Sequence, residues 1–479
     1  MTSAGLLECG EVFIGGQWHA PQGAGRRDVE NPATELVIGH AADGGESDVT
    51  DAVAAARAAF PAWSRATVED RLAVLERWYD ELSARYADLV AITVAEVGAP
   101  VAIAREAHVD LGLAVLRSYL DSAGDVAWEE QIGNSLVLRE AAGVAACITP
   151  WNYPFYQVIA KLGGALVAGC TVVLKPAELT PLSAYLLVDA ADRAGLPAGV
   201  LNLVPGPGRV VGEALVTHPD VDVVSFTGST GVGARITALA APDVKRVCLE
   251  LGGKSASLVL ADADLVPAVT ASVQAGMLNS GQTCSAWSRL LVPEHLRGTA
   301  EEIAAAAARD LVLGSPEDEG TWLGPVVSAA QREIVGGFVD RAVAAGARAV
   351  AGGSARPFEV GHFHAATVLT DVARDAEVVR DEVFGPVLTI QGYADETDAV
   401  AMANDSTYGL HGAVWSADPD RALAVARRLR TGQVDINGAA FNPAAPFGGY
   451  GRSGNGRELG RFGIEEFLET KSIQQPVPQ

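Results

Sequence analysis

The sequence predicts an α/β protein in which a parallel, doubly wound sheet is joined to a second α/β part and a small β flap. Two patterns support this prediction. Between residues 143 and 251, strand-like apolar runs alternate with helical segments, and turns rich in glycine or proline separate them. Such alternation produces parallel strands covered by helices. A second series of strand-like runs lies between residues 257 and 436. A chain of 479 residues is also too long for a single core.

Helices are expected to dominate the chain before the central sheet. Short strands come first, and Ser47 is predicted to cap a helix over residues 48–63. Thr67 and Asp70 resemble a capping box for the next helix. A third helix is predicted over about residues 103–122. We expect these helices to cover the core without contributing to a functional site.

A β-hairpin is predicted before the central sheet. Polar and apolar residues alternate over residues 131–140, around a turn at Gly133-Asn134. The residues alone are equally compatible with a hairpin that pairs with another subunit and with a solvated flap. At the other end of the chain, residues 471–479 are predicted to be extended.

The central sheet supplies the expected ligand site. Its strands are predicted at residues 144–148, 171–174, 200–204, 221–226 and 246–251. Ligands of parallel sheets bind at the carboxyl ends of the strands, and the turns of this region follow those ends. In the second α/β part, strands are predicted near residues 257–260, 290–292, 387–391, 412–415 and 433–436. There, Asp418-Pro419 is expected to begin a helix that runs to about Arg430.

The overall charge excludes several classes of partner. Lys and Arg total 35 against 59 Asp and Glu, which gives a net charge of −24. A negative field repels phosphate backbones and anionic lipid, so neither a nucleic acid nor a membrane is an expected partner. The most apolar stretch, residues 158–174, contains Lys161 and several glycines and does not read as a membrane span.

The cysteines indicate a reducing compartment. No two of them form a C-x-x-C pair, and an odd, sparse set is a poor disulfide framework or zinc site. Residues 1–10 show no signal peptide. A cytoplasmic protein without a bound metal is therefore expected. The cysteines are Cys9, Cys147, Cys170, Cys248 and Cys284.

Cys284 is the candidate nucleophile. It lies among small and polar residues, Gly281-Gln282-Thr283 before it and Ser285 after it, whereas Cys147, Cys170 and Cys248 lie among aliphatic residues. A sulfur that a substrate must reach suits the first setting better than the second.

Two other polar residues at strand ends are candidates for acid–base and oxyanion roles. Glu250 ends an apolar strand, and a buried carboxylate there is either an ion-pair partner, for example of Lys254, or a general base with a raised pKa. Asn152 follows another strand, where its amide either shapes the turn or donates to an oxyanion.

A nucleotide site is predicted at two neighbouring turns. The run Gly228-Ser229-Thr230-Gly231 lies between a strand and a helix, where backbone N–H groups can hold a pyrophosphate, although many such turns are glycine-rich only to turn. Lys175 and Glu178 follow another strand and are either a solvated loop or partners of a ribose. A 2′-phosphate beside Glu178 would be repelled by roughly 4 kcal/mol at about 4 Å. NAD is therefore expected in preference to NADP.

Together these residues resemble the motifs of the aldehyde dehydrogenase superfamily, from about Phe13 to the C-terminus. The stretches stand in the family's order and span about 300 residues, so their specificity is high. They are Pro150-Trp151-Asn152, Leu174-Lys175-Pro176-Ala177-Glu178, Phe226-Thr227-Gly228-Ser229-Thr230, Leu249-Glu250-Leu251-Gly252-Gly253-Lys254, Gly281-Gln282-Thr283-Cys284, Glu382-Val383-Phe384-Gly385-Pro386 and Pro446-Phe447-Gly448-Gly449-Tyr450.

The resemblance implies a role for each matching residue. Cys284 is the nucleophile, Glu250 the general base and Asn152 the oxyanion donor. It also implies a Rossmann-like NAD-binding domain (residues 1–120 and 142–251), a catalytic domain (252–455), an oligomerisation flap and tail (121–141 and 456–479), and a homodimer or homotetramer. The cofactor-contacting positions are Trp151, Lys175, Glu178, Gly208, Thr227, Gly228, Ser229, Leu251, Glu382 and Phe384.

The implied reaction is the NAD-dependent oxidation of an aldehyde to an acid. The Cys284 thiolate adds to the aldehyde, hydride leaves for the nicotinamide, and Glu250 activates the water that hydrolyses the thioester. Two other activities remain open. A branch that transfers the acyl group to coenzyme A typically lacks the glutamate that is present here. A cysteine hydrolase without cofactor needs a histidine partner, and no histidine lies in a motif stretch.

The substrate pocket is expected to be aromatic. Tyr153, Tyr156, Trp287 and Phe441 are its predicted lining, although Trp287 is equally compatible with a core position. Ala160 stands where members selective for betaine aldehyde carry tryptophan, which disfavours that substrate. Apolar or aromatic aldehydes are therefore expected.

Overall fold

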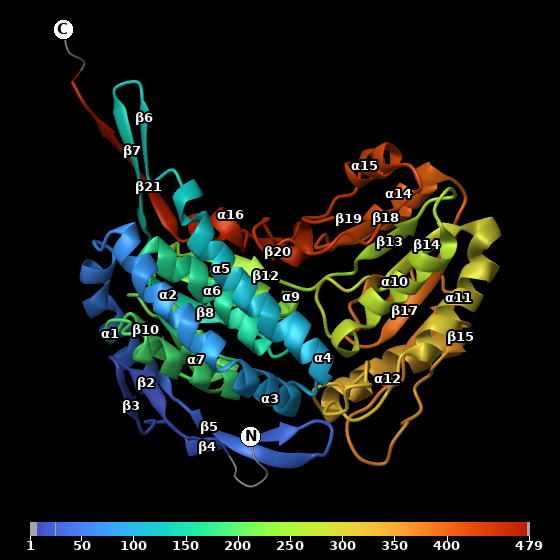
Figure 1. The fold of residues 1–479 in the computed structure, drawn as a ribbon, viewed down its shortest axis with the longest axis horizontal. Helices are drawn as coiled ribbons and strands as arrows, with labels where there is room; N and C mark the ends of the chain where they lie inside the picture. Colours follow the sequence, from blue (N-terminus) through green and yellow to red (C-terminus); the bar gives the residue numbers. More distant parts are fainter. Residues whose placement is uncertain (1–6, 24, 477–479) are drawn as a thin grey trace.

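A computed structural model describes residues 7–23 and 25–476 and confirms the predicted α/β fold with parallel sheets (Figure 1). The ends of the predicted N-terminal segment and tail, residues 1–6 and 477–479, lie outside the described residues. An eight-stranded and a seven-stranded sheet form the two large parts, and two three-stranded sheets flank them.

The eight-stranded sheet contains all the strands predicted for the central sheet. Its parallel strands are buried along nearly their whole length, which explains their continuous apolar sequences. They are β8 (Val144–Ile148), β9 (Thr171–Lys175), β10 (Leu201–Leu203), β11 (Val223–Thr227) and β12 (Arg246–Glu250). Antiparallel strands close both edges: β2 (Val12–Ile14) and β3 (Gln17–His19) on one side, and β20 (Gly454–Asn455) on the other.

Helices cover both faces of this sheet. One face is covered by α1 (Glu46–Trp63), α8 (Glu213–Thr217) and α9 (Thr230–Ala240). On the other face, α6 (Pro154–Ala168) and α7 (Leu182–Arg193) lie beneath an outer layer of α2 (Val68–Ala84), α3 (Tyr86–Val97) and α5 (Leu111–Ser122). Every residue of α6 is buried, since the helix lies between the sheet and α5. A short helix, α4 (Val101–Ile103), and two π-helical segments, η1 (Ala104–Asp110) and η3 (Gly208–Gly212), complete this part.

The second large part is built in the same way. Its sheet contains β13 (Ala256–Val259), β14 (Arg289–Pro293), β16 (Thr367–Thr370), β17 (Val387–Tyr393), β18 (Gly412–Trp415) and β19 (Asp435–Ile436), with β15 (Arg348–Ala351) antiparallel at one edge. Its helices are α10 (Leu265–Met277), α11 (Arg297–Asp310), α12 (Ala329–Ala344), α13 (Glu377–Arg380), α14 (Glu396–Asn404) and α15 (Pro419–Ala426). The sequence did not predict β15 and β16.

The predicted hairpin forms and pairs with the C-terminal segment. Strands β6 (Glu129–Ile132) and β7 (Ser135–Ala141) are joined at the predicted turn, and β21 (Leu468–Gln474) pairs antiparallel with β7 along its whole length. This three-stranded flap projects from the body of the molecule (Figure 1). The helix α16 (Gly460–Glu465) precedes β21 and packs against α6.

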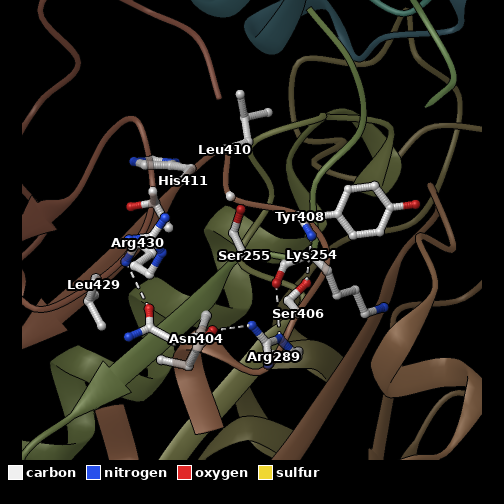
Figure 2. Close-up of a pocket in the computed structure, with 15 residues that line it drawn as sticks. Lys254, Ser255, Arg289, Asn404, Ser406, Tyr408, Leu410, His411, Leu429 and Arg430 are labelled. Carbon is white, nitrogen blue, oxygen red and sulfur yellow. Dashed lines mark hydrogen bonds between the residues drawn. The ribbon is translucent and has the colours of Figure 1, made fainter. Parts of the chain in front are cut away.

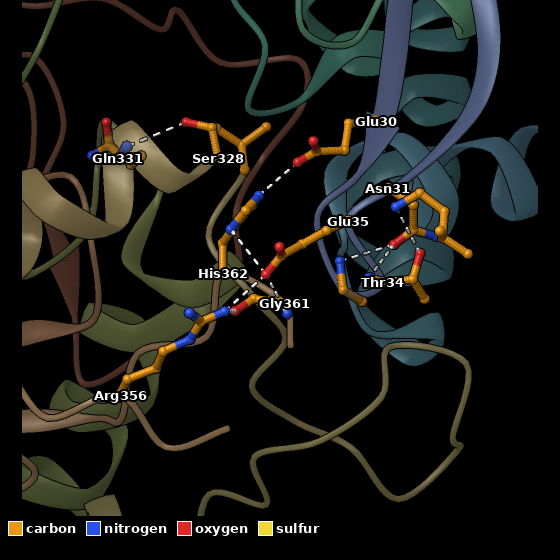
Figure 3. Close-up of polar contacts among 12 residues, drawn as sticks. Glu30, Asn31, Thr34, Glu35, Ser328, Gln331, Arg356, Gly361 and His362 are labelled. Carbon is orange, nitrogen blue, oxygen red and sulfur yellow. Dashed lines mark hydrogen bonds and ion pairs between the residues drawn. The ribbon is translucent and has the colours of Figure 1, made fainter. Parts of the chain in front are cut away.

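An N-terminal sheet ties the two large parts together. It contains β1 (Leu7–Cys9), β4 (Gly25–Asn31) and β5 (Leu36–Asp43). His362, from the loop between β15 and β16, lies 2.6 Å from the Glu30 carboxylate, and the backbone N–H of Gly361 donates to Glu35 at 2.8 Å (Figure 3). Arg356 pairs with the same Glu35 at 2.8 Å.

Several local predictions need correction. Gly45, not Ser47, is the N-cap of α1, because the Asp48 carboxylate accepts a hydrogen bond from the Gly45 N–H at 2.8 Å. The helix after Asp418 ends at Ala426 rather than near Arg430. A separate helix, α3, was missed between the second and third predicted helices.

The cap at Thr67 is confirmed, since its hydroxyl accepts from the Asp70 N–H. No helix among the described residues is long and apolar enough to span a membrane.

Candidate active site

Cys284 lies in a tight loop between α10 and β14. The 3-10 turn Leu278–Gly281 precedes it, and the last three residues of this turn have positive φ angles of 53°, 58° and 70°. A Cβ at Gly281 would lie 2.1 Å from the Gly385 carbonyl oxygen, so this position admits only glycine. The left-handed turns reverse the chain and bring the cysteine to the wall of two cavities.

Asn152 is fixed against this loop by two hydrogen bonds. The side-chain Nδ2 of Asn152 donates to the backbone carbonyl of Gln282 at 2.9 Å. The backbone carbonyl of Asn152 accepts from Asn279 Nδ2 at 2.8 Å. The side chain is only 3% exposed and shares a cavity with Cys284. The second proton of this amide nitrogen remains available for a ligand. The structure thus brings these two predicted catalytic residues together.

Glu250 ends β12 and is buried. Burial first, and then the Glu458 carboxylate, raise the pKa of Glu250 well above its usual range, whereas Lys161 and Arg457 oppose that rise. Oε2 of Glu250 has no hydrogen-bond partner among the described residues. A Cβ at Gly448 would lie 2.6 Å from Oε1, so glycine leaves room for the carboxylate. Glu250 does not line the cavities at Cys284, but its charge acts on that thiol.

The ion pair between Glu250 and Lys254 that the sequence left open does not form. Lys254 is instead buried beside Arg289 and Glu382. Burial and the Arg289 charge lower the pKa of Lys254 to about 7. Cys248 also differs from its expected aliphatic setting, since its thiol contacts Glu466 Oε2 at 3.2 Å. Cys147 and Cys170 are buried as expected.

The Cys284 thiol is not activated in the ligand-free protein. Burial raises its pKa to about 12, and the carboxylates of Glu382 and Glu250 add to this rise. A hydrogen bond from the Ser285 backbone opposes it only in part. Generation of the thiolate therefore requires a change in this environment when ligands bind.

One of the cavities at Cys284 is mostly apolar and has a volume of about 270 Å³. All four residues predicted for the substrate pocket line it: Tyr153, Tyr156, Trp287 and Phe441. Trp287 also packs edge-on against Trp415, with ring centroids 6.2 Å apart, so it is both a core residue and a wall of the cavity.

The sequence missed several residues of this cavity. Ala107 of η1 and Leu111 of α5 belong to helices that were expected only to cover the core. Gln157, His411 and Asp435 also line it. No spacing signal relates His411 to Asp435 along the chain. They meet because β18 and β19 are neighbouring parallel strands, in which Ala413 is opposite Asp435.

The other cavity at Cys284 leads toward the turns of the central sheet. It has a volume of about 230 Å³, and its wall includes Trp151, Leu251, Glu382 and Phe384. A larger cavity of about 720 Å³ adjoins it and is lined by Lys175, Glu178 and Gly208. Both cavities share a wall formed by Trp151, Thr227, Gly228 and Ser229. Every residue predicted to contact the cofactor thus lines one or both of these two adjoining cavities.

The polar groups of the larger cavity are held by the backbone. Lys175 Nζ donates to the Pro176 carbonyl at 2.7 Å, and burial lowers the pKa of this lysine to about 8. The Glu178 carboxylate accepts from the Gly208 N–H at 2.7 Å and lies 3.3 Å from Arg27. Arg27 comes from β4, and no motif in the sequence indicated that it would line this cavity.

The start of α9 forms another side of this cavity. The Ser229 hydroxyl caps the helix and accepts from the Val232 N–H at 3.4 Å. The Thr227 hydroxyl is buried and has no partner among the described residues. In the adjoining smaller cavity, Glu382 accepts from the Gly253 N–H at 2.9 Å, and burial raises the pKa of Glu382 to about 7. A Cβ at Gly252 would lie 2.0 Å from the Glu382 carboxylate, which explains the glycine there.

His411 is the histidine that a cofactor-free cysteine hydrolase would require, because it lines the same cavity as Cys284. Its ring nitrogens, however, contact other groups. Nδ1 lies 3.2 Å from the Ser285 carbonyl, and Nε2 lies 3.0 Å from Asp435. The geometry therefore does not favour a cysteine–histidine pair.

Comparisons with known proteins agree with this geometry. The family model described as "Aldehyde dehydrogenase family" matches residues 18–473. The chain is 46% identical over 466 residues to a 3-succinoylsemialdehyde-pyridine dehydrogenase from a Pseudomonas species, and the match covers 97% of this chain and 98% of the relative.

Solved structures are also similar over nearly their full length. A cysteine-to-alanine mutant of aldehyde dehydrogenase C from Pseudomonas syringae, in complex with NAD+ and octanal, has a TM-score of 0.97, 44% identity and 98% coverage of both chains. An aldehyde dehydrogenase of Mycobacterium tuberculosis in complex with NAD+ has a TM-score of 0.96 and 38% identity, with 98% of this chain and 99% of the other covered. Since the family model and these relatives span almost the whole chain, the protein belongs to the aldehyde dehydrogenase family of oxidoreductases.

Proposed function

We propose that the protein oxidises an aldehyde to the carboxylic acid with NAD, through a thioester on Cys284. The observation that carries this proposal is the position of Cys284, which is the residue shared by the apolar cavity and the cavity that leads to the central sheet. An aldehyde in the first and a nicotinamide in the second would meet at its sulfur.

The residues of the larger cavity fit a dinucleotide. The first backbone N–H groups of α9 are a ready site for a phosphate. Lys175 and Glu178 can bond ribose hydroxyls, one as donor and the other as acceptor. Glu382 would hold the other ribose, and Trp151 and Phe384, which pack edge-on with centroids 5.2 Å apart, would bound the nicotinamide. When bound, NAD supplies the acceptor for the hydride that leaves the aldehyde carbon.

The first chemical step uses Cys284 and Asn152. The thiol proton leaves for water, the sulfur forms a bond to the aldehyde carbon, and the electrons of the carbonyl π bond move to the oxygen, which becomes an oxyanion. The free N–H of Asn152 Nδ2 would donate to that oxygen, together with the Cys284 backbone N–H. Because Gln282 and Asn279 already hold the asparagine, it needs little reorganisation.

Glu250 would act in the second step. Hydrolysis of the thioester needs a base that takes a proton from water as the oxygen attacks the acyl carbon. A carboxylate whose pKa is raised by burial is a stronger base than an exposed one. Its presence also favours hydrolysis over transfer of the acyl group to coenzyme A, which is the second candidate reaction.

NAD is proposed in preference to NADP. The Glu178 carboxylate is fixed by the Gly208 N–H and lies at the rim of the larger cavity, where it would repel a 2′-phosphate. Arg27 partly balances this charge at 3.3 Å. The relatives from P. syringae and M. tuberculosis are described in complex with NAD+, which supports the binding of NAD.

The substrate is proposed to be an apolar or aromatic aldehyde. The cavity wall is mostly apolar, and tyrosine, tryptophan and phenylalanine rings contribute to it. The P. syringae relative is described in complex with octanal, and the Pseudomonas relative is named for a semialdehyde that carries a pyridine; both compounds are compatible with such a wall.

Assembly is proposed to involve the flap. Its strands expose side chains along their length, including Ile132 at 55% and Ile473 at 41%. A homodimer or homotetramer that covers this sheet is expected. Each subunit would contain the predicted NAD-binding, catalytic and oligomerisation regions. The five free cysteines support a reducing compartment such as the cytoplasm.

The proposal is tested with a panel of aldehydes, each assayed with NAD and with NADP by the appearance of reduced cofactor. We expect acid to form without coenzyme A and Cys284→Ala to abolish the activity. A strict requirement for coenzyme A would replace hydrolysis by acyl transfer, and full activity of Cys284→Ala would reject the nucleophile.

A further inference from the structure

The apolar cavity beside Cys284 carries an uneven distribution of charge. Asp435 is the only carboxylate among the described residues that line it, and neither lysine nor arginine is among them. The Asp435 side chain is 15% exposed. Its Oδ1 accepts from Gln433 Nε2 at 3.2 Å, which is an uncharged partner.

His411 lies between this carboxylate and the backbone carbonyl of Ser285, which follows Cys284 in the chain. Its Nε2 lies 3.0 Å from the Asp435 carboxylate but has no hydrogen-bond partner among the described residues, because the N–H···O angle is unfavourable. Its Nδ1 lies 3.4 Å from Trp287 Nε1, which is a donor, so a neutral ring can accept there. No Lys or Arg side chain among the described residues pairs with Asp435, whose side-chain contacts are with His411 and Gln433.

The other cations of this region do not reach the cavity. Arg289 donates to the carbonyls of Lys254 and Met402 at 2.9 Å and of Ala403 at 2.8 Å. Arg289, Lys254 and Ala403 line a separate pocket of only about 10 Å³, which His411 also borders (Figure 2). A pocket of that volume has room for about one water molecule and is too small for a substrate.

A second polar group is available on the α6 side of the cavity. Gln157 is 2% exposed, lines the cavity, and its Oε1 has no hydrogen-bond partner among the described residues. Because an amide can present either its oxygen or its nitrogen, Gln157 suits a polar substituent of either hydrogen-bonding type. The sign of the charge that the cavity accepts is therefore set by Asp435.

We propose that Asp435, together with His411, selects the aldehyde by charge. The preferred substrate carries a basic nitrogen or a hydrogen-bond donor on an apolar or aromatic body, and aldehydes that carry a second, anionic carboxylate are rejected. This inference rests on the proposed aldehyde oxidation.

The test uses three propanals of the same shape that differ in charge. Their remote ends are a meta-tolyl group, an N-methylpyridinium group and a meta-carboxyphenyl group, which are neutral, positive and negative. In the wild-type protein with NAD, we expect kcat/KM for the cation to exceed that for the anion by at least about tenfold. In Asp435→Asn this ratio should fall to about one, and in Asp435→Glu, which keeps the charge, it should stay high.

A matched control separates the local charge from the net charge of the protein. Asp80 is exposed on α2, away from the cavity, and Asp80→Asn removes the same charge without an expected change in the ratio. Thermal unfolding of each variant shows that it is folded before its ratio is used.

The outcomes distinguish this inference from the function on which it rests. If the wild-type protein oxidises the tolyl aldehyde but treats the cation and the anion alike, charge selection is wrong while aldehyde oxidation stands. A high ratio in Asp435→Asn would equally reject the role of that residue. If none of the three aldehydes, nor octanal, reduces NAD, the proposed function itself fails and the inference fails with it.

Discussion

Lys161 Nζ on α6 lies 2.7 Å from Oε1 of Glu458, and both side chains are buried, at 0% and 9% exposed. The lysine also donates to Ser225 of β11 at 3.1 Å. This pair lies close to Glu250, since the Glu458 charge raises the pKa of Glu250 and the Lys161 charge lowers it. The stability of the core and the basicity of the proposed catalytic carboxylate therefore depend on the same two charges.

Replacement of Lys161 by methionine should affect both properties. Unfolding should become easier by about 3–5 kcal/mol, because a buried carboxylate loses its partner. The pKa of Glu250 should rise further, so the acidic limb of the pH profile for thioester hydrolysis should move to higher pH. Urea unfolding and pre-steady-state kinetics measure the two effects. The double variant Lys161→Met/Glu458→Gln should recover most of the stability, and a single variant as stable as wild type would contradict the prediction.

Alkylation of Cys284 by iodoacetamide should be slow at neutral pH in the ligand-free protein. Because the pKa of the thiol is raised to about 12, the thiolate fraction should grow about tenfold for each pH unit between about pH 7 and pH 10. Mass spectrometry of the Cys284 peptide follows the reaction without interference from the other cysteines. A plateau below about pH 9 would show that the thiol is already activated.

Glu250→Gln should trap the acyl enzyme. The amide cannot take a proton from water, so thioester hydrolysis should slow by about 10²–10⁴-fold, while acylation continues. Intact-protein mass spectrometry after addition of NAD and aldehyde should then show the acyl mass. The double variant Glu250→Gln/Cys284→Ala provides the control, since it should carry no adduct. Normal turnover by Glu250→Gln would point to another base.

Glu178→Gln should relax the choice of cofactor. Removal of this charge leaves Arg27 in the larger cavity, so the ratio of kcat/KM for NADP to that for NAD should rise by at least about tenfold. Steady-state assays with both cofactors measure this ratio. Glu302 is exposed on α11, and Glu302→Gln should leave the ratio unchanged. An equal ratio in wild type and Glu178→Gln would assign the preference to another group.

The sequence by itself determined the fold class, the order of most of the main elements and the motif residues that line the cavities at Cys284. Apolar runs with glycine-rich turns are sufficient to predict parallel strands, and motif residues at strand ends must converge, because parallel strands share one carboxyl edge. A Cβ would clash with a neighbouring group at three glycines of the motifs, Gly281, Gly252 and Gly448. The packing around the site therefore requires glycine at these positions.

The tertiary structure alone decided which charges act on one another. Lys161 and Glu458 are separated by 297 residues in the sequence. Arg27 lies on β4 and pairs with Glu178, which follows β9 of another sheet. His411 and Asp435 face the same cavity because two short strands pair in one register. No local pattern encodes such contacts. The pKa values of Cys284 and Glu250 depend on burial and on these distant charges, so they follow from the packed structure and not from the order of residues.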